Sequence, residues 1–254
     1  MIDLHCHLLP GIDDGPADEP AAIALARALV AEGVTTVAAT SHVNPGYPGN
    51  TATSLRAVRA TVADAIAREG IALEVVAGAE LDLLHVARFD AEALRALQLG
   101  DGGTLLVECP FADAAPFFAE TIGRFQGLGF RVLLAHPERS PAFLREPALL
   151  ERLVAGGTMA SLTASSLTGR FGRTAKRYAD WALERELIHD VATDAHNTDG
   201  RPPVLRAPLE ESGYGWAEQW LTIDAPAAIL SGAPLPARPA RPRRRFAALR
   251  RGRG

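Results

Sequence analysis

Short runs of apolar and β-branched residues alternate along this chain with longer alanine-rich stretches that have a helical pattern. Runs of this length and composition are typical of buried strands. The predicted strands are Met1–His5, Thr35–Thr40, Leu73–Glu80, Thr104–Glu108, Arg131–Ala135, Met159–Leu162 and Ile188–Thr193. The predicted helices are Pro20–Glu32, Thr53–Arg68, Pro116–Leu128, Pro147–Ala155 and Thr174–Glu186, with a shorter one at Asp90–Leu97.

Strands that alternate with helices indicate parallel βα units, which build either a barrel or a doubly wound sheet. The chain has 254 residues, of which 48% are hydrophobic, and this size suits one large α/β barrel domain. Neither the G-x-G-x-x-G pattern nor a P-loop pattern occurs in the sequence, so a nucleotide-binding sheet has no direct support. The expected fold class is therefore α/β, with a barrel favoured.

Histidines and acids gather at the ends of the predicted strands. Five of the seven histidines lie there, as do three acids: His5, His7, His42, His136, His196, Glu80, Glu108 and Asp194. In a βα barrel the active site lies at the carboxyl ends of the strands. The sequence therefore predicts one site to which six different strands contribute.

The spacing of these residues favours metal binding. His5 and His7 are two residues apart, so on a strand both imidazoles point to one face, and Asp194 and His196 repeat that spacing. Asp14 adds a further carboxylate close to the N-terminus. Nine such side chains exceed what one ion needs and suit two or three ions that share bridging carboxylates.

The two cysteines, Cys6 and Cys109, are out of phase with the neighbouring ligand-type residues, and we interpret them as small buried hydrophobic side chains. A site of nitrogen and oxygen ligands without thiolate suits Mn, Fe, Zn or Co. Two cysteines so far apart do not suggest a disulfide framework, so a reducing cytosol is expected.

Two arginines follow the predicted ligands, Arg139 after His136 and Arg201 after His196. An arginine beside metal ions can bind a phosphate with two hydrogen bonds and stabilise charge in a transition state. The alternative is a surface ion pair with Glu138 or Asp199. The remaining histidines, His85 and His189, fit neither group and are interpreted as structural or surface residues.

The charge of the chain is uneven. Residues 237–254 contain eight arginines and no acid, and removing these charges from the net charge of −4 leaves −12 for residues 1–236. We expect a barrel domain over residues 1–236 and a basic, disordered tail over 237–254. The tail has either no partner or an anionic one, and composition does not separate a membrane surface from a nucleic acid. The sequence shows neither a signal peptide nor an apolar run long enough for a transmembrane span, so a cytoplasmic location is expected.

Seven segments carry a resemblance to a known family: "MIDLHCHLLPGIDDGP", "TTVAATSHVNPGY", "VVAGAEL", "LLVECPF", "VLLAHPER", "SLTGRFG" and "VATDAHNTDGRPP". Together they resemble the PHP-domain (polymerase and histidinol phosphatase) proteins. The chain is most similar to the bacterial manganese-dependent protein tyrosine phosphatases that are encoded with capsule and exopolysaccharide genes. The likeness covers about residues 1–205, and "DAPAAIL" resembles the family's closing helix.

The resemblance implies a distorted seven-stranded βα barrel that holds a cluster of three Mn ions. His5, His7, Glu80 and Asp194 would bind the first ion. Glu80 would bridge to a second ion, bound also by Glu108 and His136, and the third ion would be held by Asp14, His42 and His196. The family spacing favours Asp14 over its neighbour Asp13, and Arg139 and Arg201 fall where the family binds phosphate.

The resemblance also implies hydrolysis of protein phosphotyrosine through a metal-bridging hydroxide, with a bacterial tyrosine kinase of polysaccharide export as the substrate. Neither cysteine begins the C-x5-R pattern of a cysteine-dependent phosphatase. Three alternatives remain open. They are a small-molecule phosphatase such as one for histidinol phosphate, a non-catalytic docking module, and a metal-dependent amidohydrolase or nuclease. The arginines disfavour an amide substrate, and the acidic body disfavours a long nucleic acid.

Overall fold

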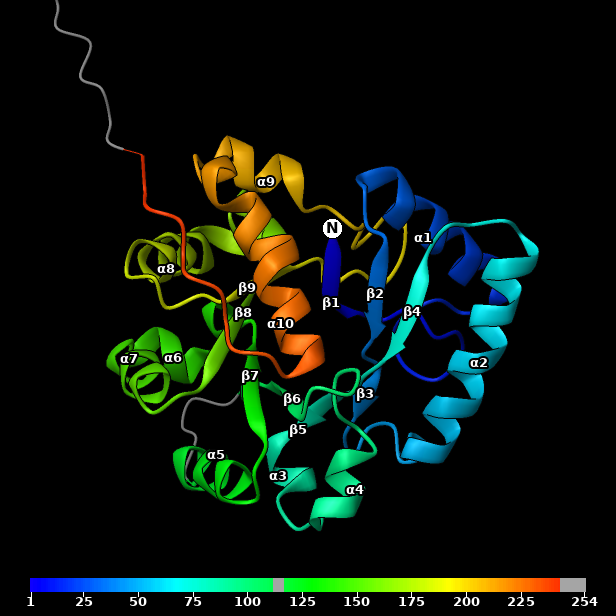
Figure 1. Cartoon of the computed structure of the whole chain (residues 1–254), viewed down its shortest axis with the longest axis horizontal. Coiled ribbons are helices and arrows are strands. Elements are labelled where there is room, and N and C mark those ends of the chain that lie inside the picture. The colour runs from blue at the N-terminus through cyan, green and yellow to red at the C-terminus, as the bar shows by residue number, and fades with distance from the viewer. Residues whose placement is uncertain (112–116, 243–254) are drawn as a thin grey trace, which may run out of the picture.

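The structure is a computed structural model that describes residues 1–111 and 117–242. The first residue of the predicted helix Pro116–Leu128 and most of the predicted tail lie outside these residues. The described chain contains nine strand segments, all paired in parallel, with helices around them (Figure 1). They are β1 (Ile2–Cys6), β2 (Thr36–Ala39), β3 (His42–Val43), β4 (Glu74–Ala77), β5 (Glu80–Asp82), β6 (Thr104–Glu108), β7 (Arg131–Ala135), β8 (Met159–Thr163) and β9 (Asp190–Ala192).

These strands form two sheets. One has the order β1-β2-β4, and the other has the order β3-β5-β6-β7-β8-β9. The chain after β9 meets β1, because Cys6 and Ala195 form a parallel bridge and the amide of Asp194 donates to the carbonyl oxygen of His5 at 2.8 Å. The first strand and the last are therefore neighbours in space.

Helices lie outside the strands, as expected for βα units (Figure 1). They are α1 (Glu19–Glu32), α2 (Ala52–Arg68), α3 (Leu83–Val86), α4 (Ala91–Arg95), α5 (Phe118–Gly127), α6 (Pro141–Arg145), α7 (Ala148–Ala155), α8 (Gly172–Glu184), α9 (Arg206–Glu211) and α10 (Ala225–Ser231). The helix α1 begins and ends as the sequence indicates. The side chain of Asp18 accepts from the amide of Ala21, and Gly33 adopts the left-handed conformation (φ 98°) after the last turn.

The core has two parts. The larger cluster packs the helices against the outer faces of the strands. A smaller one lies among the strands themselves, where Leu4, Leu106 and Leu133 meet Ile229 of α10. Ile229 belongs to the "DAPAAIL" segment, so this segment forms a helix that closes one end of the strand assembly. The ligand-type residues lie toward the other end, where the strands finish.

The α/β class with parallel strands is confirmed, whereas seven uninterrupted strands are not what the structure shows. The predicted strand Leu73–Glu80 is divided into β4 and β5, which belong to different sheets, and Thr35–Thr40 is followed by the separate short strand β3. Both breaks occur at the same place in space. A Cβ atom on Gly78 would lie 2.9 Å from Cγ2 of Thr40, so the backbones approach closely there.

The first residues of the predicted tail contact the body. Arg238 lies over the ring of Trp220, with its Cζ 4.1 Å from the ring centroid, and donates to the carbonyl oxygen of Glu186 at 3.3 Å. Residues 243–254 lie outside the described part of the chain, so a disordered tail there stays a prediction.

The close approach at Gly78 gives a test of the fold. We expect Gly78→Ala to lower the free energy of unfolding by about 1–3 kcal/mol, because its new methyl group meets Thr40 and also Leu99 at 3.0 Å. Gly123, within α5, has nothing within 4 Å of its Cβ position, so Gly123→Ala should raise stability by about 0.5–1 kcal/mol. Urea unfolding of both variants checks this, and an unchanged midpoint for Gly78→Ala would contradict it.

Candidate metal centre

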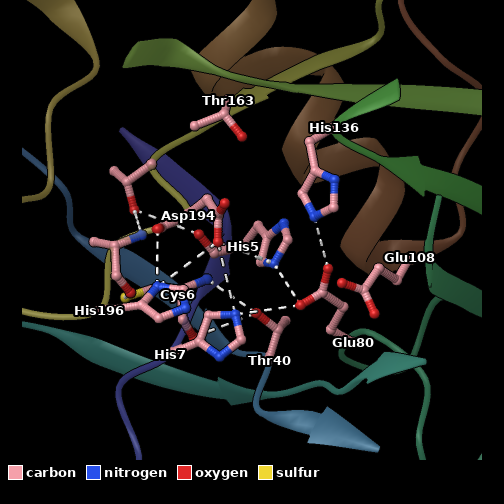
Figure 2. Close-up of polar contacts among 12 residues, drawn as sticks. His5, Cys6, His7, Thr40, Glu80, Glu108, His136, Thr163, Asp194 and His196 are labelled. Atoms are coloured by element: carbon pink, nitrogen blue, oxygen red, sulfur yellow. Dashed lines mark hydrogen bonds and ion pairs between the residues drawn. The ribbon is translucent and has the colours of Figure 1, made fainter. Parts of the chain in front are cut away.

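The carboxylate of Glu80 lies at the centre of the predicted site and is 1% exposed. Its Oε2 atom lies 3.2 Å from Nε2 of His5, 3.3 Å from Nε2 of His7 and 3.1 Å from Nδ1 of His42. Its Oε1 atom accepts a hydrogen bond of 2.9 Å from Nε2 of His136. One buried carboxylate therefore has four imidazoles around it, from the end of β1, from β3 and from the end of β7. Figure 2 shows those of His5, His7 and His136.

The breaks in the strands are what bring Glu80 and His42 to this position. His42 begins β3 and Glu80 begins β5, and the two residues are direct partners in the parallel register. Both were predicted at or just after strand ends, but each is the first residue of a second strand segment.

The remaining predicted ligands lie around this carboxylate. Oδ1 of Asp194 is 3.5 Å from Nε2 of His5. Asp14 lies between two histidines, with Oδ1 3.5 Å from Nε2 of His42 and Oδ2 3.3 Å from Nε2 of His196. Glu108 is more distant, and its Oε2 is 4.0 Å from Nδ1 of His42. The structure thus brings all nine predicted ligand residues into one cluster.

Two of these residues have strained backbones. His136 and Asp194 follow directly or closely on β7 and β9, and their φ angles are 37° and 51°. Residues other than glycine seldom adopt positive φ, and such strain is concentrated at functional sites. The turn after β7 places His136 on Glu80, and the turn after β9 places Asp194 beside His5.

The donor atoms in the cluster fit metal ions. Nε2 of His5, Nε2 of His7 and Nδ1 of His42 are buried and have no hydrogen-bond partner within the described residues, although each is close to Glu80. Buried polar atoms are rarely left without a partner, and a cation would supply one. Three groups have ligand atoms within 4.8 Å of one another: His7, Asp14, His42 and His196; His5, His7 and Glu80; His42, Glu80 and Glu108.

These groups differ in part from the ligand sets that the family resemblance implies. His42 is grouped with Glu80 and Glu108 as well as with Asp14, and His7 is grouped with Asp14 as well as with His5. His136 and Asp194 fall outside all three groups but contact Glu80 and His5 directly. The cluster is therefore compatible with several ions that share Glu80, and the assignment of each ligand to one ion stays a prediction.

The pKa values show how the cluster responds to its own buried charge. Burial opposes protonation of His7, but its hydrogen bond to Asp13 and the carboxylate of Glu80 raise its pKa to about 10. Burial works against ionisation of Glu80, yet the charge of His5 and the hydrogen bond from His136 hold the pKa of Glu80 well below its usual range. The pKa values of His5 and His7 are raised, so their protons offset the charge of the carboxylates, a role that a metal cation would take over.

Asp13 and Asp14 have different environments. Oδ2 of Asp13 is 2.9 Å from Nδ1 of His7 and accepts from the amide of His42 at 3.1 Å, and its Oδ1 accepts from the amide of Gly15. Asp13 therefore orients His7 from behind, as the outer partners of metal-ligating histidines do. Asp14 is the member of the pair that faces the other ligands.

Arg139 and Arg201 converge on one carboxylate. Both guanidinium groups pair with Oδ2 of Asp194. The surface partners considered from the sequence were Glu138 and Asp199. Oε1 of Glu138 instead accepts from the amide of Thr163 and from the Ser166 hydroxyl, and Asp199 is exposed. Both arginines line a cavity of about 160 Å³ together with most of the cluster. Two positive groups thus stand beside the predicted ligands, as a phosphate site requires.

Asp3 is a residue that sequence reasoning missed. Its Oδ1 accepts from the amides of Thr193, at 3.0 Å, and His5, at 3.3 Å, while its Oδ2 accepts from the Thr193 hydroxyl at 2.6 Å. The buried carboxylate therefore ties the end of β1 to the chain just before Asp194. Its signal in the sequence was an acid in an otherwise apolar strand, two residues before His5 and so on the same face.

The other histidines and the cysteines have structural environments. His189 is half-buried and its Nδ1 accepts from the amide of Ala160, whereas His85 is exposed on α3. Cys6 and Cys109 are both free and buried, which confirms their interpretation as buried hydrophobic side chains. Burial raises the pKa of both thiols, which makes them poor nucleophiles.

Comparison with known proteins identifies the family of this chain. The profile of a family described as "Capsular polysaccharide synthesis, CpsB/CapC" matches residues 1–219. The chain belongs to the CpsB/CapC family. The expected resemblance to capsule-associated tyrosine phosphatases is thereby confirmed.

Individual CpsB/CapC relatives are similar over most of their length. The tyrosine-protein phosphatase YwqE of Bacillus subtilis (strain 168) is 37% identical over 202 residues, which are 79% of each chain. The tyrosine-protein phosphatase CpsB of Streptococcus pneumoniae is 27% identical over 215 residues, which are 81% of this chain and 87% of the relative.

Solved structures extend the comparison to the fold. A structure described among those of YwqE from Bacillus subtilis and CpsB from Streptococcus pneumoniae, metal-dependent tyrosine phosphatases, superposes with a TM-score of 0.85 at 32% identity. It covers 95% of this chain and 100% of that one. The lactonase Lmo2620 from Listeria monocytogenes superposes with a TM-score of 0.56 at 10% identity, over 90% of this chain and 94% of that one, and shares the fold alone.

None of the described helices combines the length with the apolar character that a bilayer span requires.

Asp190, buried below the cluster in β9, predicts a pH effect on stability. Burial raises its pKa from 3.8 to about 8, even though the Ser161 hydroxyl donates to it. The folded pKa is above the unfolded one, so the stability contribution of the neutral carboxyl is complete below about pH 4 and is lost as the pH rises through 8. We expect the melting temperature of Asp190→Asn to fall less between pH 5 and pH 9 than that of the unmodified chain.

Calorimetry at several pH values measures this difference. Asp101→Asn, at an exposed carboxyl, is the control and should keep the pH dependence of the unmodified chain. An equally steep fall in Asp190→Asn would show that Asp190 is ionised in the folded protein throughout this range.

Proposed function

We propose that this chain is a metal-dependent protein tyrosine phosphatase that hydrolyses phosphotyrosine monoesters. The observation that carries the proposal is the juxtaposition of a nine-residue histidine and carboxylate cluster, centred on Glu80, with two arginines on one side of a cavity. Membership of a family with named tyrosine phosphatases supports the same reaction. The chain is a phosphoric monoester hydrolase.

The proposed ligands are His5, His7, Asp14, His42, Glu80, Glu108, His136, Asp194 and His196, and the proposed metal is Mn, with Fe, Zn or Co as alternatives. Histidine nitrogens mixed with carboxylate oxygens suit these ions. Such ions supply Lewis-acid stabilisation of the phosphoryl group and lower the pKa of water. Asp13 orients His7, and Asp3 holds the ends of two strands in place.

Arg139 and Arg201 have the role of binding the phosphoryl oxygens. Asp194 holds both guanidinium groups toward the cavity, so little reorganisation is needed when a phosphate enters. The leaving group of phosphotyrosine is a phenolate, whose conjugate acid has a pKa of about 10. It departs more readily than an alkoxide, so a strong general acid is less necessary, and neither buried cysteine is needed as a nucleophile.

The wider proposal concerns fold, partner and location. The bridge between Cys6 and Ala195 supports closure of the strands into a distorted barrel. The family's description as capsular polysaccharide synthesis supports a bacterial tyrosine kinase of polysaccharide export as the phosphotyrosine substrate, in the cytoplasm. The partner of the basic tail stays open.

The activity itself is the first prediction. We expect the purified chain to hydrolyse p-nitrophenyl phosphate and a phosphotyrosine peptide with added Mn and to stop with excess EDTA. His5→Ala and Glu80→Ala should each lower kcat/KM by more than about 100-fold, since even outer partners of metal ligands typically cost 10–100-fold. Phosphate release assays measure both effects.

His85→Ala is the matched control, because it removes an exposed histidine outside the cluster and should leave the rate unchanged. Histidinol phosphate serves as the competing substrate. Turnover of histidinol phosphate in preference to the peptide would replace the proposal with a small-molecule phosphatase. If the metal-loaded chain hydrolyses no phosphomonoester, the non-catalytic docking module becomes the favoured function.

Asp13 and Asp14 give a second prediction, because their roles differ. Asp14→Asn removes a proposed ligand and should lower the number of Mn ions retained per chain. Asp13→Asn weakens a carboxylate that orients His7 and accepts from the amides of Gly15 and His42, but it removes no proposed ligand. It should therefore keep that number at saturating Mn while weakening affinity about 10–100-fold. Elemental analysis and chelator competition distinguish the two, and the reverse pattern would make Asp13 the ligand.

A further inference from the structure

Phe111 is the one apolar side chain among the described residues that line the cavity beside the cluster. The other lining residues are histidines, acids and arginines. Phe111 follows β6 by three residues and is 52% exposed, whereas most large apolar side chains in the described chain are buried. A single exposed apolar residue is ordinary on a protein surface. In this cavity, Phe111 supplies the apolar contact among the lining residues that the structure describes.

The ring of Phe111 is held in position despite its exposure. Its centroid lies 5.5 Å from Cζ of Arg139 and 5.7 Å from the centroid of the His136 ring. The segment just before it is also fixed, because the carbonyl oxygen of Pro110 accepts a hydrogen bond of 2.6 Å from the Ser140 hydroxyl. A contact surface that is already ordered loses little entropy when a ligand packs against it.

Phe111 is therefore adjacent to both parts of the proposed machinery. His136 contacts Glu80, and Figure 2 shows Glu108 directly beside Glu80. Arg139 belongs to the pair that would hold the phosphoryl oxygens. In an aryl phosphate the aromatic ring is joined to phosphorus through one oxygen, so a phosphate held by Arg139 brings that ring within reach of Phe111.

We propose that Phe111 is a specificity-determining residue against which the phenyl ring of phosphotyrosine packs, so that the site favours aryl over alkyl phosphomonoesters. This inference rests on the proposed phosphatase function and extends it. Aromatic rings attract one another at centroid separations of about 4.5–7 Å, in addition to the gain from burying apolar surface. Phosphoserine offers only a methylene group at that position and gains little from Phe111.

Phe171 provides a control for the competing role of merely supporting Arg139. Its ring centroid lies 4.4 Å from Cζ of Arg139, closer than that of Phe111, but Phe171 is not among the cavity-lining residues. Loss of Phe171 should disturb the arginine and so affect all phosphate esters alike. Loss of Phe111 should affect aryl esters more than alkyl esters.

The test compares kcat/KM for a phosphotyrosine peptide and for the same peptide with phosphoserine. We expect Phe111→Ala to lower the ratio of the two about tenfold, mainly through KM for phosphotyrosine, as loss of one ring contact and its buried surface predicts. Phe111→Tyr keeps an aromatic ring at this position, so its ratio should equal that of the unmodified chain. Phe171→Ala should leave the ratio unchanged while lowering both rates.

Binding of non-hydrolysable ligands gives an independent readout. Calorimetry with phenylphosphonate and methylphosphonate should show the preference for the phenyl compound in the unmodified chain and its loss in Phe111→Ala. An equal loss for both ligands, or no loss for either, would overturn the specificity role. A chain that binds both ligands but hydrolyses no phosphomonoester would contradict the proposed function. The binding preference for the phenyl compound would then still decide the role of Phe111.

Discussion

The burial of the Glu80 carboxylate among four imidazoles is the constraint on which the rest of the site depends. A buried carboxylate is costly unless positive charge and hydrogen bonds surround it. His5 and His7 at the end of β1, His42 in β3 and His136 after β7 surround this carboxylate, so three parts of the chain must meet at it. The break in the strands at Gly78 therefore belongs to the site as much as to the fold, because it sets the position of Glu80.

The same charge balance explains the arrangement around Asp194. This buried carboxylate pairs with both Arg139 and Arg201. The charge of His5 and the charges of the two arginines hold its pKa well below the usual range against the effect of burial. The result is a small cavity that is lined both by the histidines and carboxylates of the cluster and by the two arginine guanidinium groups. A dianionic phosphate ester is the substrate chemistry that complements such a site, and Phe111 adds an apolar contact at its edge.

The sequence predicted which residues gather in one cluster better than it predicted the strands. The two-residue spacing of His5 and His7 and the placement of acids after apolar runs are local signals, and all nine residues meet in space. The division of Leu73–Glu80 into two strands depends on close backbone contact between Gly78 and Thr40, which no local pattern records. The contribution of Asp3 depends on residues almost two hundred positions away, so periodicity could place the residue on the right face but could not identify its partners.

The central claim is that Glu80 organises a metal cluster, and anomalous diffraction from crystals grown with Mn tests it most directly. Data collected above and below the Mn absorption edge locate the ions without reference to activity. The account predicts two or three Mn peaks within the cluster, with one in contact with the carboxylate of Glu80 and no peak at His85 or His189. Peaks that lie away from Glu80, or a cluster without Mn at saturating concentration, would contradict it.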